Sequence, residues 1–286
     1  MRRDHKALPR FRARAEDLAE LLLDHRPSSI TDVNLQAGED PIAVREVALP
    51  LIRWLKESGT LGVSVCLGTL DTELYEALRE AGASIYIMKF ESADPGHYQA
   101  LRAPGSLSER LRHIRYLAGA GWKVSSGFIA GLASLVSPGP DPESASRELE
   151  AAVSLASELP LIGCSVSPFI PGESTPHAGS SAAGIDETLN SMALLRLARP
   201  DWIIPAVSAL HLAQPGEGYR RGLRCGANLA TINLTPEPVR GDYLLYKRER
   251  FIMTEGRLLD ALAQENLEPS KVGLGPFLES PVPASL

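Results

Sequence analysis

A chain of 286 residues with 44% hydrophobic and 22% charged residues has the composition of a globular protein with a sizeable core, in one or two domains. Its formal net charge of −6, without a stripe of basic residues, argues against a nucleic-acid-binding surface. No apolar run reaches the ~18 residues of a membrane span and no apolar signal segment follows Met1, so we expect a cytoplasmic protein without a membrane anchor.

Apolar runs typical of strands alternate with amphipathic helical patterns along the chain. The expected strands are 30–36, 62–68, 84–92, 123–131, 163–170, 202–209 and 227–234. The expected helices are 14–25, 42–58, 72–81, 106–120, 142–159, 185–199 and 216–225. This alternation predicts an α/β protein with a parallel sheet, and its length favours a (β/α) TIM-type barrel over an open doubly wound sheet.

Several helix ends carry local signals. Ser106 and Glu109 have the spacing of a capping box at the start of a helix. Gly59, Gly82 and Gly121 lie where a helix has to stop before the next strand.

The count of seven strands predicts an incomplete barrel, in which the first strand is missing. Two strand edges with unpaired backbone groups would remain, and we expect a missing N-terminal strand, a partner chain, self-association or the C-terminal tail to cover them. We assign residues 1–265 to the barrel domain and 266–286 to a proline-containing tail, which is a poor strand donor.

Active sites of such barrels lie where the strands end. The residues there form a polar rim of mixed charge, which includes Glu39, Lys89 and Glu91 beside a glycine-containing turn. This rim suits a small zwitterionic ligand, because an ammonium group prefers carboxylates and carbonyls, whereas a carboxylate prefers arginine or lysine. For the single serines in the rim, simple solvation of the strand ends remains an alternative.

Five segments in order resemble one family. They are LQAGEDP (35–41), IMKFESAD (87–94), the helix and strand at 106–132, GCSVSPFIPGESTPHAG (163–179), and the pair 204–210 and 224–236. They are similar to the radical S-adenosylmethionine (SAM) enzymes, in the branch of the hydrogenase maturases, methylornithine synthases and biotin synthases. The resemblance runs from Arg2 to about residue 265.

The resemblance implies a SAM site and an amino-acid-like small-molecule substrate. The turn at Gly38 and Glu39 would hold the SAM ammonium group, and Arg110 takes the place of the arginine that pairs with the SAM carboxylate. Lys89 and Glu91 stand in the family's charged run, where lysine replaces arginine and so weakens a bidentate contact. The residues expected to line the substrate space are Ser126, Ser165, Ser167, Ser208 and Thr235.

The cysteines depart from the family pattern. The family holds a [4Fe-4S] cluster with a Cys-x3-Cys-x2-Cys loop just before the segment that Arg2 begins, whereas Cys66, Cys164 and Cys225 are far apart. We therefore expect the cluster for the family but no metal ligands from this sequence. A second departure is Gly-Leu-Ala-Ser at 131–134, where the family has Gly-Leu-Pro-Gly.

Four hypotheses for the function remain open. The chain is a shortened form of a radical enzyme, or a relative without the cluster that performs polar SAM-dependent transfer. The third hypothesis is a non-catalytic binding protein or half of a split complex. A different class would be an aldolase-like barrel in which Lys89 forms a Schiff base with a carbonyl substrate.

Overall fold

The computed structural model of the protein describes residues 11–59, 61–136, 142–173, 175–240 and 251–280. Within these ranges, strands β1 to β5 form one parallel sheet in sequential order, and β6 pairs in parallel with β7. A bridge between Gly163 and Ile203 continues the sheet from β5 towards β6. The strands are β1 (Asp32–Gln36), β2 (Gly62–Cys66), β3 (Ile85–Ile87), β4 (Lys123–Ala130), β5 (Gly163–Pro168), β6 (Pro205–Ala206) and β7 (Leu229–Ala230).

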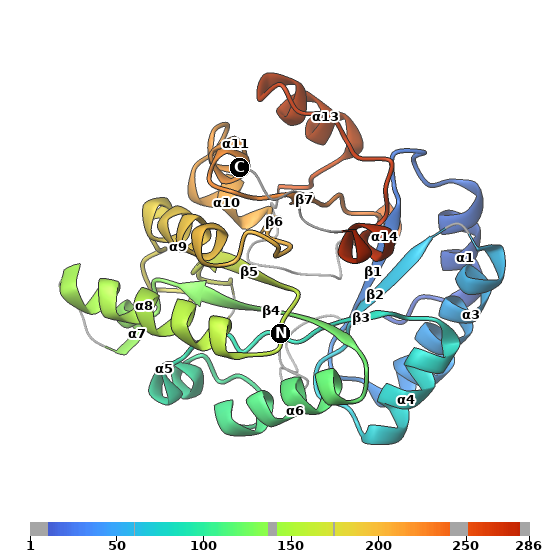
Figure 1. Ribbon diagram of the computed structural model, residues 1–286, viewed down its shortest axis with the longest axis horizontal. Coiled ribbons are helices and arrows are strands. Elements are labelled where there is room, and N and C mark those ends of the chain that lie inside the picture. Colours follow the sequence, from blue (N-terminus) through green and yellow to red (C-terminus); the bar gives the residue numbers. More distant parts are fainter. Residues whose placement is uncertain (1–10, 60, 137–141, 174, 241–250, 281–286) are drawn as a thin grey trace.

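Helices follow the strands and cover the outer, convex side of the curled sheet (Figure 1). The predicted parallel, incomplete TIM-type barrel is therefore confirmed. The longer helices are α1 (Ala15–Asp24), α3 (Leu49–Ser58), α4 (Thr72–Ala81), α6 (Leu107–Gly119), α8 (Pro142–Glu158), α9 (Ile185–Ala198) and α13 (Glu255–Gln264). The shorter ones are α2 (Pro41–Ala43), α5 (Pro95–Ala100), α7 (Ala133–Val136), α10 (Ala209–Ala213), α11 (Gly218–Arg224), α12 (Glu237–Arg240) and α14 (Leu274–Glu279).

The local signals at the helix ends are confirmed. The Ser106 hydroxyl accepts the backbone N–H of Glu109 at 3.2 Å and so caps α6. Gly59, Gly82 and Gly121 have positive φ angles of 68°, 124° and 85°, which a residue with a side chain rarely adopts. The helices therefore stop where the sequence predicts.

The segment predicted as one helix at 42–58 is interrupted. Between α2 and α3 lies a π-helical turn, Val44–Ala48, in which Leu49 donates its N–H to the carbonyl of Val44. Pro50 follows in the first turn of α3 and has no N–H to donate, so the regular i→i−4 ladder cannot pass this point.

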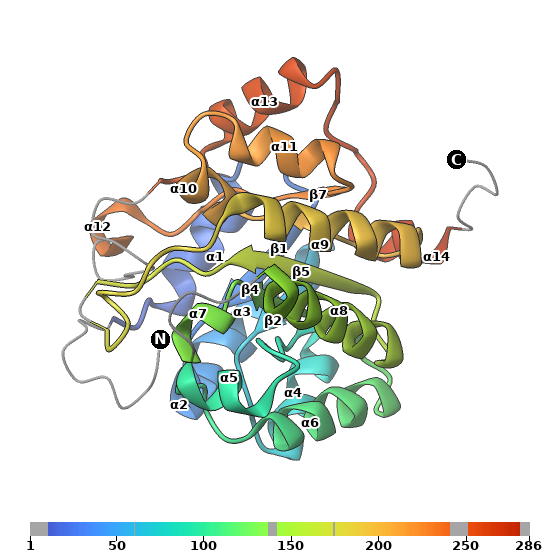
Figure 2. The same ribbon diagram turned by 90° about the vertical axis from the view of Figure 1, so that its left-hand side faces the viewer.

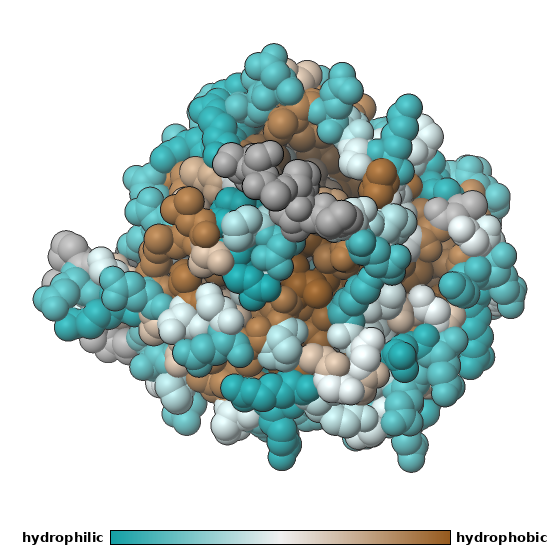
Figure 3. Space-filling view, viewed as in Figure 1, coloured by the Kyte–Doolittle hydropathy of each residue, from teal (hydrophilic) through white to brown (hydrophobic). Residues whose placement is uncertain are grey.

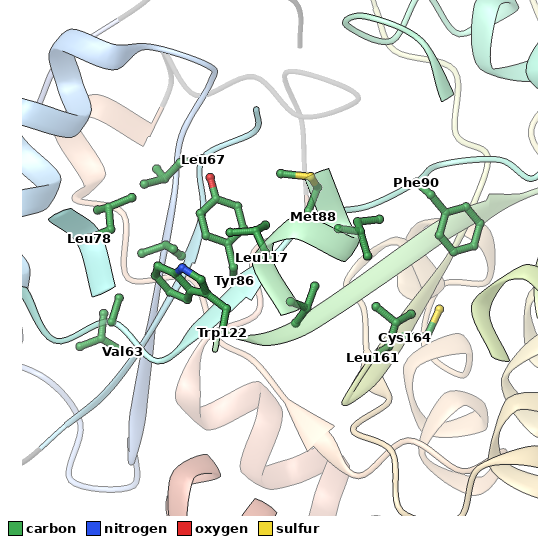
Figure 4. Packing of buried hydrophobic residues seen from close by; sticks show 14 of the residues in the cluster. Val63, Leu67, Leu78, Tyr86, Met88, Phe90, Leu117, Trp122, Leu161 and Cys164 are labelled. Atoms are coloured by element: carbon green, nitrogen blue, oxygen red, sulfur yellow. The ribbon is translucent and has the colours of Figure 1, made fainter. Parts of the chain in front are cut away.

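A buried aromatic cluster joins the sheet to the helices. Tyr86 on β3 packs edge-on against Trp122, with ring centres 5.3 Å apart, and against Tyr75 of α4 at 5.1 Å. Figure 4 shows Tyr86, Trp122 and Leu117 packed together on the helix side of the strands. The alternate positions of β3, Ile85 and Ile87, face the inner side of the sheet.

C-terminal segments lie beside the first strand. Ser29, just before β1, donates to Glu255 at the start of α13, and the N–H of Leu274 donates to Asp32 of β1 at 2.9 Å. In Figure 2, α14 lies at the side where the strands begin. The predicted tail thus contributes a helix rather than a strand. Residues 1–10 of the predicted barrel domain and 281–286 of the tail lie outside the described ranges.

Candidate functional site

The charged residues predicted for the site lie beyond the ends of β1 and β3, on the side that α2 and α7 mark in Figure 2. Glu39 and the exposed Gly38 form the loop between β1 and α2. Asp40 caps α2 by accepting the N–H groups of Ile42 and Ala43. Because this cap fixes where the helix begins, the loop that carries Glu39 has a defined position.

Glu39 and Arg110 form an ion pair, with 3.2 Å between Oε1 and Nη2. The Arg110 side chain is only 8% exposed and that of Glu39 is 27% exposed. Arg110 also donates through Nε to the hydroxyl of Tyr98 at 3.3 Å. Burial lowers the pKa of Arg110, but the hydrogen bond to Tyr98 and the charges of Glu39 and Glu91 raise it above its ordinary value. The guanidinium therefore stays charged.

The loop after β2 closes over Glu39. The N–H of Thr69 donates to Glu39 Oε1 at 3.0 Å. Gly68 has φ 75°, and a Cβ atom at this position would lie 2.1 Å from Glu39 Cγ. Only glycine therefore leaves room for the carboxylate between the two loops.

Lys89 and Glu91 follow β3 in a bulge. Met88 donates its N–H to the carbonyl of Ser125 at 2.9 Å, and Glu91 donates to that of Gly127 at 3.0 Å. From Met88 to Glu91 the chain advances by three residues, whereas the paired part of β4 advances by two, from Ser125 to Gly127. Glu91 adopts φ 63°, a left-handed conformation that is uncommon outside glycine and often found at functional sites.

The thiol of Cys66 on β2 lies within the electrostatic reach of the predicted charged residues. Burial raises its pKa, the positive charges of Lys89 and Arg110 lower it, and the negative charge of Glu91 raises it. The structure therefore brings Glu39, Lys89, Glu91 and Arg110 together around the ends of β1, β2 and β3.

The serines divide between the two faces of the sheet. Ser165 and Ser167 pair with Gly127 and Ile129 and lie on the inner face. Ser126 alternates with Val124 and Phe128 of the outer core and pairs with the buried Cys164, and its hydroxyl donates to the carbonyl of Met88 at 2.7 Å. Ser126 therefore faces the outer core, whereas its neighbour Ser125 lies on the inner face.

The other two predicted lining residues lie beyond the five-stranded sheet. Ser208 is exposed at the start of α10, after β6. Thr235 follows β7, and its N–H donates to the Asn233 side chain at 2.8 Å within its own loop. Among the described residues, neither of them forms a hydrogen bond with Glu39 or Arg110.

Tyr98 and Thr69 belong to the site but were not predicted from the sequence. Tyr98 belongs to α5, which Asp94 caps by accepting the N–H of His97 at 2.9 Å, with Pro95 as the first helical residue. This Asp-Pro pair is a helix-start signal that would have revealed α5. The backbone N–H of Thr69 has no sequence signal, because it depends on how two loops meet.

The described cysteines do not fit an iron–sulfur cluster. Cys66 lies on β2, Cys164 on β5 with its side chain in the outer core, and Cys225 after α11. In the described part of the chain, no three His, Cys, Asp or Glu side chains are grouped to hold a metal ion. A search of the same residues for a helix long and apolar enough to cross a membrane finds none.

The three thiols should differ in reactivity. Cys164 is buried, which raises its pKa to about 12, whereas Cys66 and Cys225 are half-buried. Desolvation also raises the pKa of Cys66, and Cys225 lies at a helix end. Because the thiolate is the reactive form, iodoacetamide at pH 8 should label Cys225 first and Cys164 at least about 10-fold more slowly. Peptide mass spectrometry measures the three rates, and in urea they should become similar. Native labelling of Cys164 at the rate of Cys225 would contradict the burial described here.

The fold and the strand-end site define a parallel β/α barrel protein with a cluster of charged residues at the ends of its strands. No family model matches the sequence. The chain is 33% identical over 246 residues to the [FeFe] hydrogenase maturase subunit HydE of Thermotoga maritima, which covers 86% of this chain and 68% of that protein. It is 25% identical over 263 residues to 3-methylornithine synthase of Methanosarcina acetivorans, which covers 90% and 71%. Biotin synthase of Alkaliphilus metalliredigens is 26% identical over 208 residues, which covers 73% and 60%.

Solved structures agree on the fold. Methylornithine synthase (PylB) superposes with a TM-score of 0.71 and 23% identity, over 91% of this chain and 75% of that one. The hydrogenase maturase HydG gives a TM-score of 0.71 at 14% identity, over 94% and 60%. The chain belongs to the radical SAM superfamily, in the branch of HydE, 3-methylornithine synthase and biotin synthase.

Proposed function

We propose that this radical SAM-type protein binds the amino-acid end of SAM between Glu39 and Arg110 and acts on an amino-acid-like small molecule. Glu39 receives the SAM ammonium group and Arg110 the SAM carboxylate. The observation that carries the proposal is the ion pair of 3.2 Å between these two residues at the strand ends.

The charge pattern of the pair supports a zwitterionic ligand. An α-amino acid presents an ammonium and a carboxylate group a few ångströms apart, so it can lie across a neighbouring carboxylate and guanidinium with opposite charges facing. Glu39 is the more exposed partner, which leaves its second oxygen open to an incoming group. Lys89 and Glu91 add one charge of each sign beside the pair.

The inner face of the sheet supplies the space for the second ligand. Ser165 and Ser167 lie there, and a Cβ at Gly127 would come within 2.1 Å of Ser165 Oγ. Small side chains with hydroxyl groups therefore line the inner face of the sheet next to the charged residues. We place the amino-acid-like substrate along this wall.

The [4Fe-4S] cluster of the family is not assigned to any described residue. Cys66, Cys164 and Cys225 lie on separate elements, and desolvation raises the pKa values of the Cys66 and Cys164 thiols. Recognition of SAM by Glu39 and Arg110 is therefore proposed independently of a cluster.

Calorimetric titration with SAM tests the proposal. We expect saturable binding that Glu39→Gln weakens about 10- to 100-fold, because one charge-assisted hydrogen bond to the ligand is lost. Glu46→Gln is the matched control, since Glu46 is exposed on the π-helical turn that follows the same loop. It should leave the affinity unchanged.

Two results would remove the proposal. One is a flat thermal-shift response of the unmodified protein up to millimolar SAM. The other is an equal loss of affinity in Glu39→Gln and Glu46→Gln, which would place the ligand away from the ion pair.

A further inference from the structure

We propose that Tyr75 is a positioning residue of the SAM site, which holds the loop at 68–70 and through it the carboxylate of Glu39. This inference rests on the proposed function, because Glu39 is the group that is positioned. Tyr75 lies on α4, and its hydroxyl binds the backbone of Leu70 rather than the side chain of Glu39.

The loop after β2 is held at three consecutive residues. The carbonyl of Gly68 accepts the hydroxyl of Tyr86 at 2.8 Å. The N–H of Thr69 donates to Glu39 at 3.0 Å, and the N–H of Leu70 donates to the hydroxyl of Tyr75 at 2.9 Å. The bond to Glu39 is therefore flanked on both sides by bonds to buried tyrosines.

Tyr75 is itself fixed. Its ring is 1% exposed and packs edge-on against Tyr86 at 5.1 Å. Burial raises its pKa to about 12, so its hydroxyl keeps its proton. Because the oxygen accepts the N–H of Leu70, that proton is free to point at Nδ1 of His113, 3.1 Å away on α6.

The consequence is a chain of contacts from α6 to the ligand group. His113 and Tyr75 fix Leu70, the adjacent Thr69 N–H fixes Oε1 of Glu39, and the same oxygen pairs with Arg110. Arg110 lies on the same helix as His113, so α6 positions both halves of the ion pair. A buried hydrogen bond of this kind is strong because no water replaces it.

A double-mutant cycle in SAM binding tests the coupling. We expect Tyr75→Phe to weaken SAM binding roughly 3- to 10-fold, the effect of one buried neutral hydrogen bond. It should leave binding of 5′-methylthioadenosine unchanged, since that probe lacks the amino-acid end. In the Glu39→Gln background, Tyr75→Phe should cause no further loss, because its effect passes through Glu39.

Tyr116→Phe is the matched control. Tyr116 lies on α6, 37% exposed, with its ring 6.1 Å from that of Tyr75. The same loss for SAM and 5′-methylthioadenosine, or fully additive effects of Tyr75→Phe and Glu39→Gln, would overturn the inference. Either result would mean that Tyr75 supports the fold in general.

Hydrogen exchange without ligand separates this inference from the proposed function. In Tyr75→Phe, the amides of Thr69 and Leu70 should exchange roughly 3- to 10-fold faster than in the unmodified protein and in Tyr116→Phe. If the unmodified protein fails to bind SAM, the proposed function fails while this measurement still decides how the loop is held. Unchanged exchange at both amides would overturn the role of Tyr75.

Discussion

Arg110→Met should abolish measurable SAM binding and lower the midpoint of thermal unfolding by about 5–10 °C. Removal of one member of a buried ion pair leaves the other charge without a partner, which costs about 3–5 kcal/mol when both are fully buried. Glu39 is 27% exposed and regains some water, so we expect about 2–3 kcal/mol here. Methionine fills a similar volume, which keeps the packing loss small. Calorimetry and a thermal melt measure the two effects.

Arg112→Met provides the control for this experiment. Arg112 lies on the same helix with its side chain 74% exposed, and its ion pair with Glu109 is long, at 3.9 Å. Its replacement should change neither affinity nor stability. An Arg110→Met protein that binds SAM as tightly as the unmodified one would disprove the assignment of the carboxylate site.

Gly163→Ala should lower the stability by about 3 kcal/mol, because it overpacks the junction between the two parts of the sheet. A Cβ at this position would lie 2.3 Å from the backbone carbonyl oxygen of Ile203. That oxygen accepts the N–H of Cys164 at 3.1 Å, and the N–H of Ile203 donates to Ile162 at 3.0 Å. The added methyl group has to push these strands apart, which weakens both hydrogen bonds.

Gly179→Ala is the matched glycine replacement, since a Cβ there meets no atom within 4 Å. Thermal unfolding should fall markedly for Gly163→Ala and stay within about 1 °C for Gly179→Ala. Equal stability of the two variants would contradict the close contact between β5 and the segment at Ile203.

The sequence predicts the order of the elements well because most of their signals are local. The helix at 72–81 appears with the predicted bounds, and the capping hydroxyl of Ser106 forms its bond. The helix stops at Gly59 and Gly82 follow from backbone conformations that glycine tolerates. The π-helical turn before Pro50 depends on a single missing N–H within an otherwise regular helical pattern.

The inward direction of side chains is harder to predict. Both faces of this sheet are apolar enough that alternation along 123–130 does not separate Ser125 from Ser126. The structure places Phe128 in the outer core. Ser126 is two residues from Phe128 and therefore shares its face, whereas Ser125 is three residues away and faces inward. The bulge between Met88 and Glu91 likewise depends on the partner strand.

The contacts at the site are long-range, which explains why only part of it was predicted. Glu39 and Arg110 were expected to share a ligand, yet nothing in the sequence indicates that they pair with each other across 71 residues. The roles of Tyr75, Tyr86 and Tyr98 depend on hydroxyl groups that reach loops from neighbouring elements. Tyrosine in an amphipathic helix otherwise indicates only a core position.

The hydrogen bond between Asp32 and the N–H of Leu274 spans 242 residues. During translation at about 5–20 residues per second, roughly 10–50 s separate the emergence of these two groups. During that interval the carboxylate of Asp32 on β1 lacks the N–H of Leu274 that it binds in the folded protein. Gly62, which pairs with Asp32, has no side chain and so leaves space for this carboxylate. This contact at the start of β1 therefore forms only after residue 274 has been synthesised.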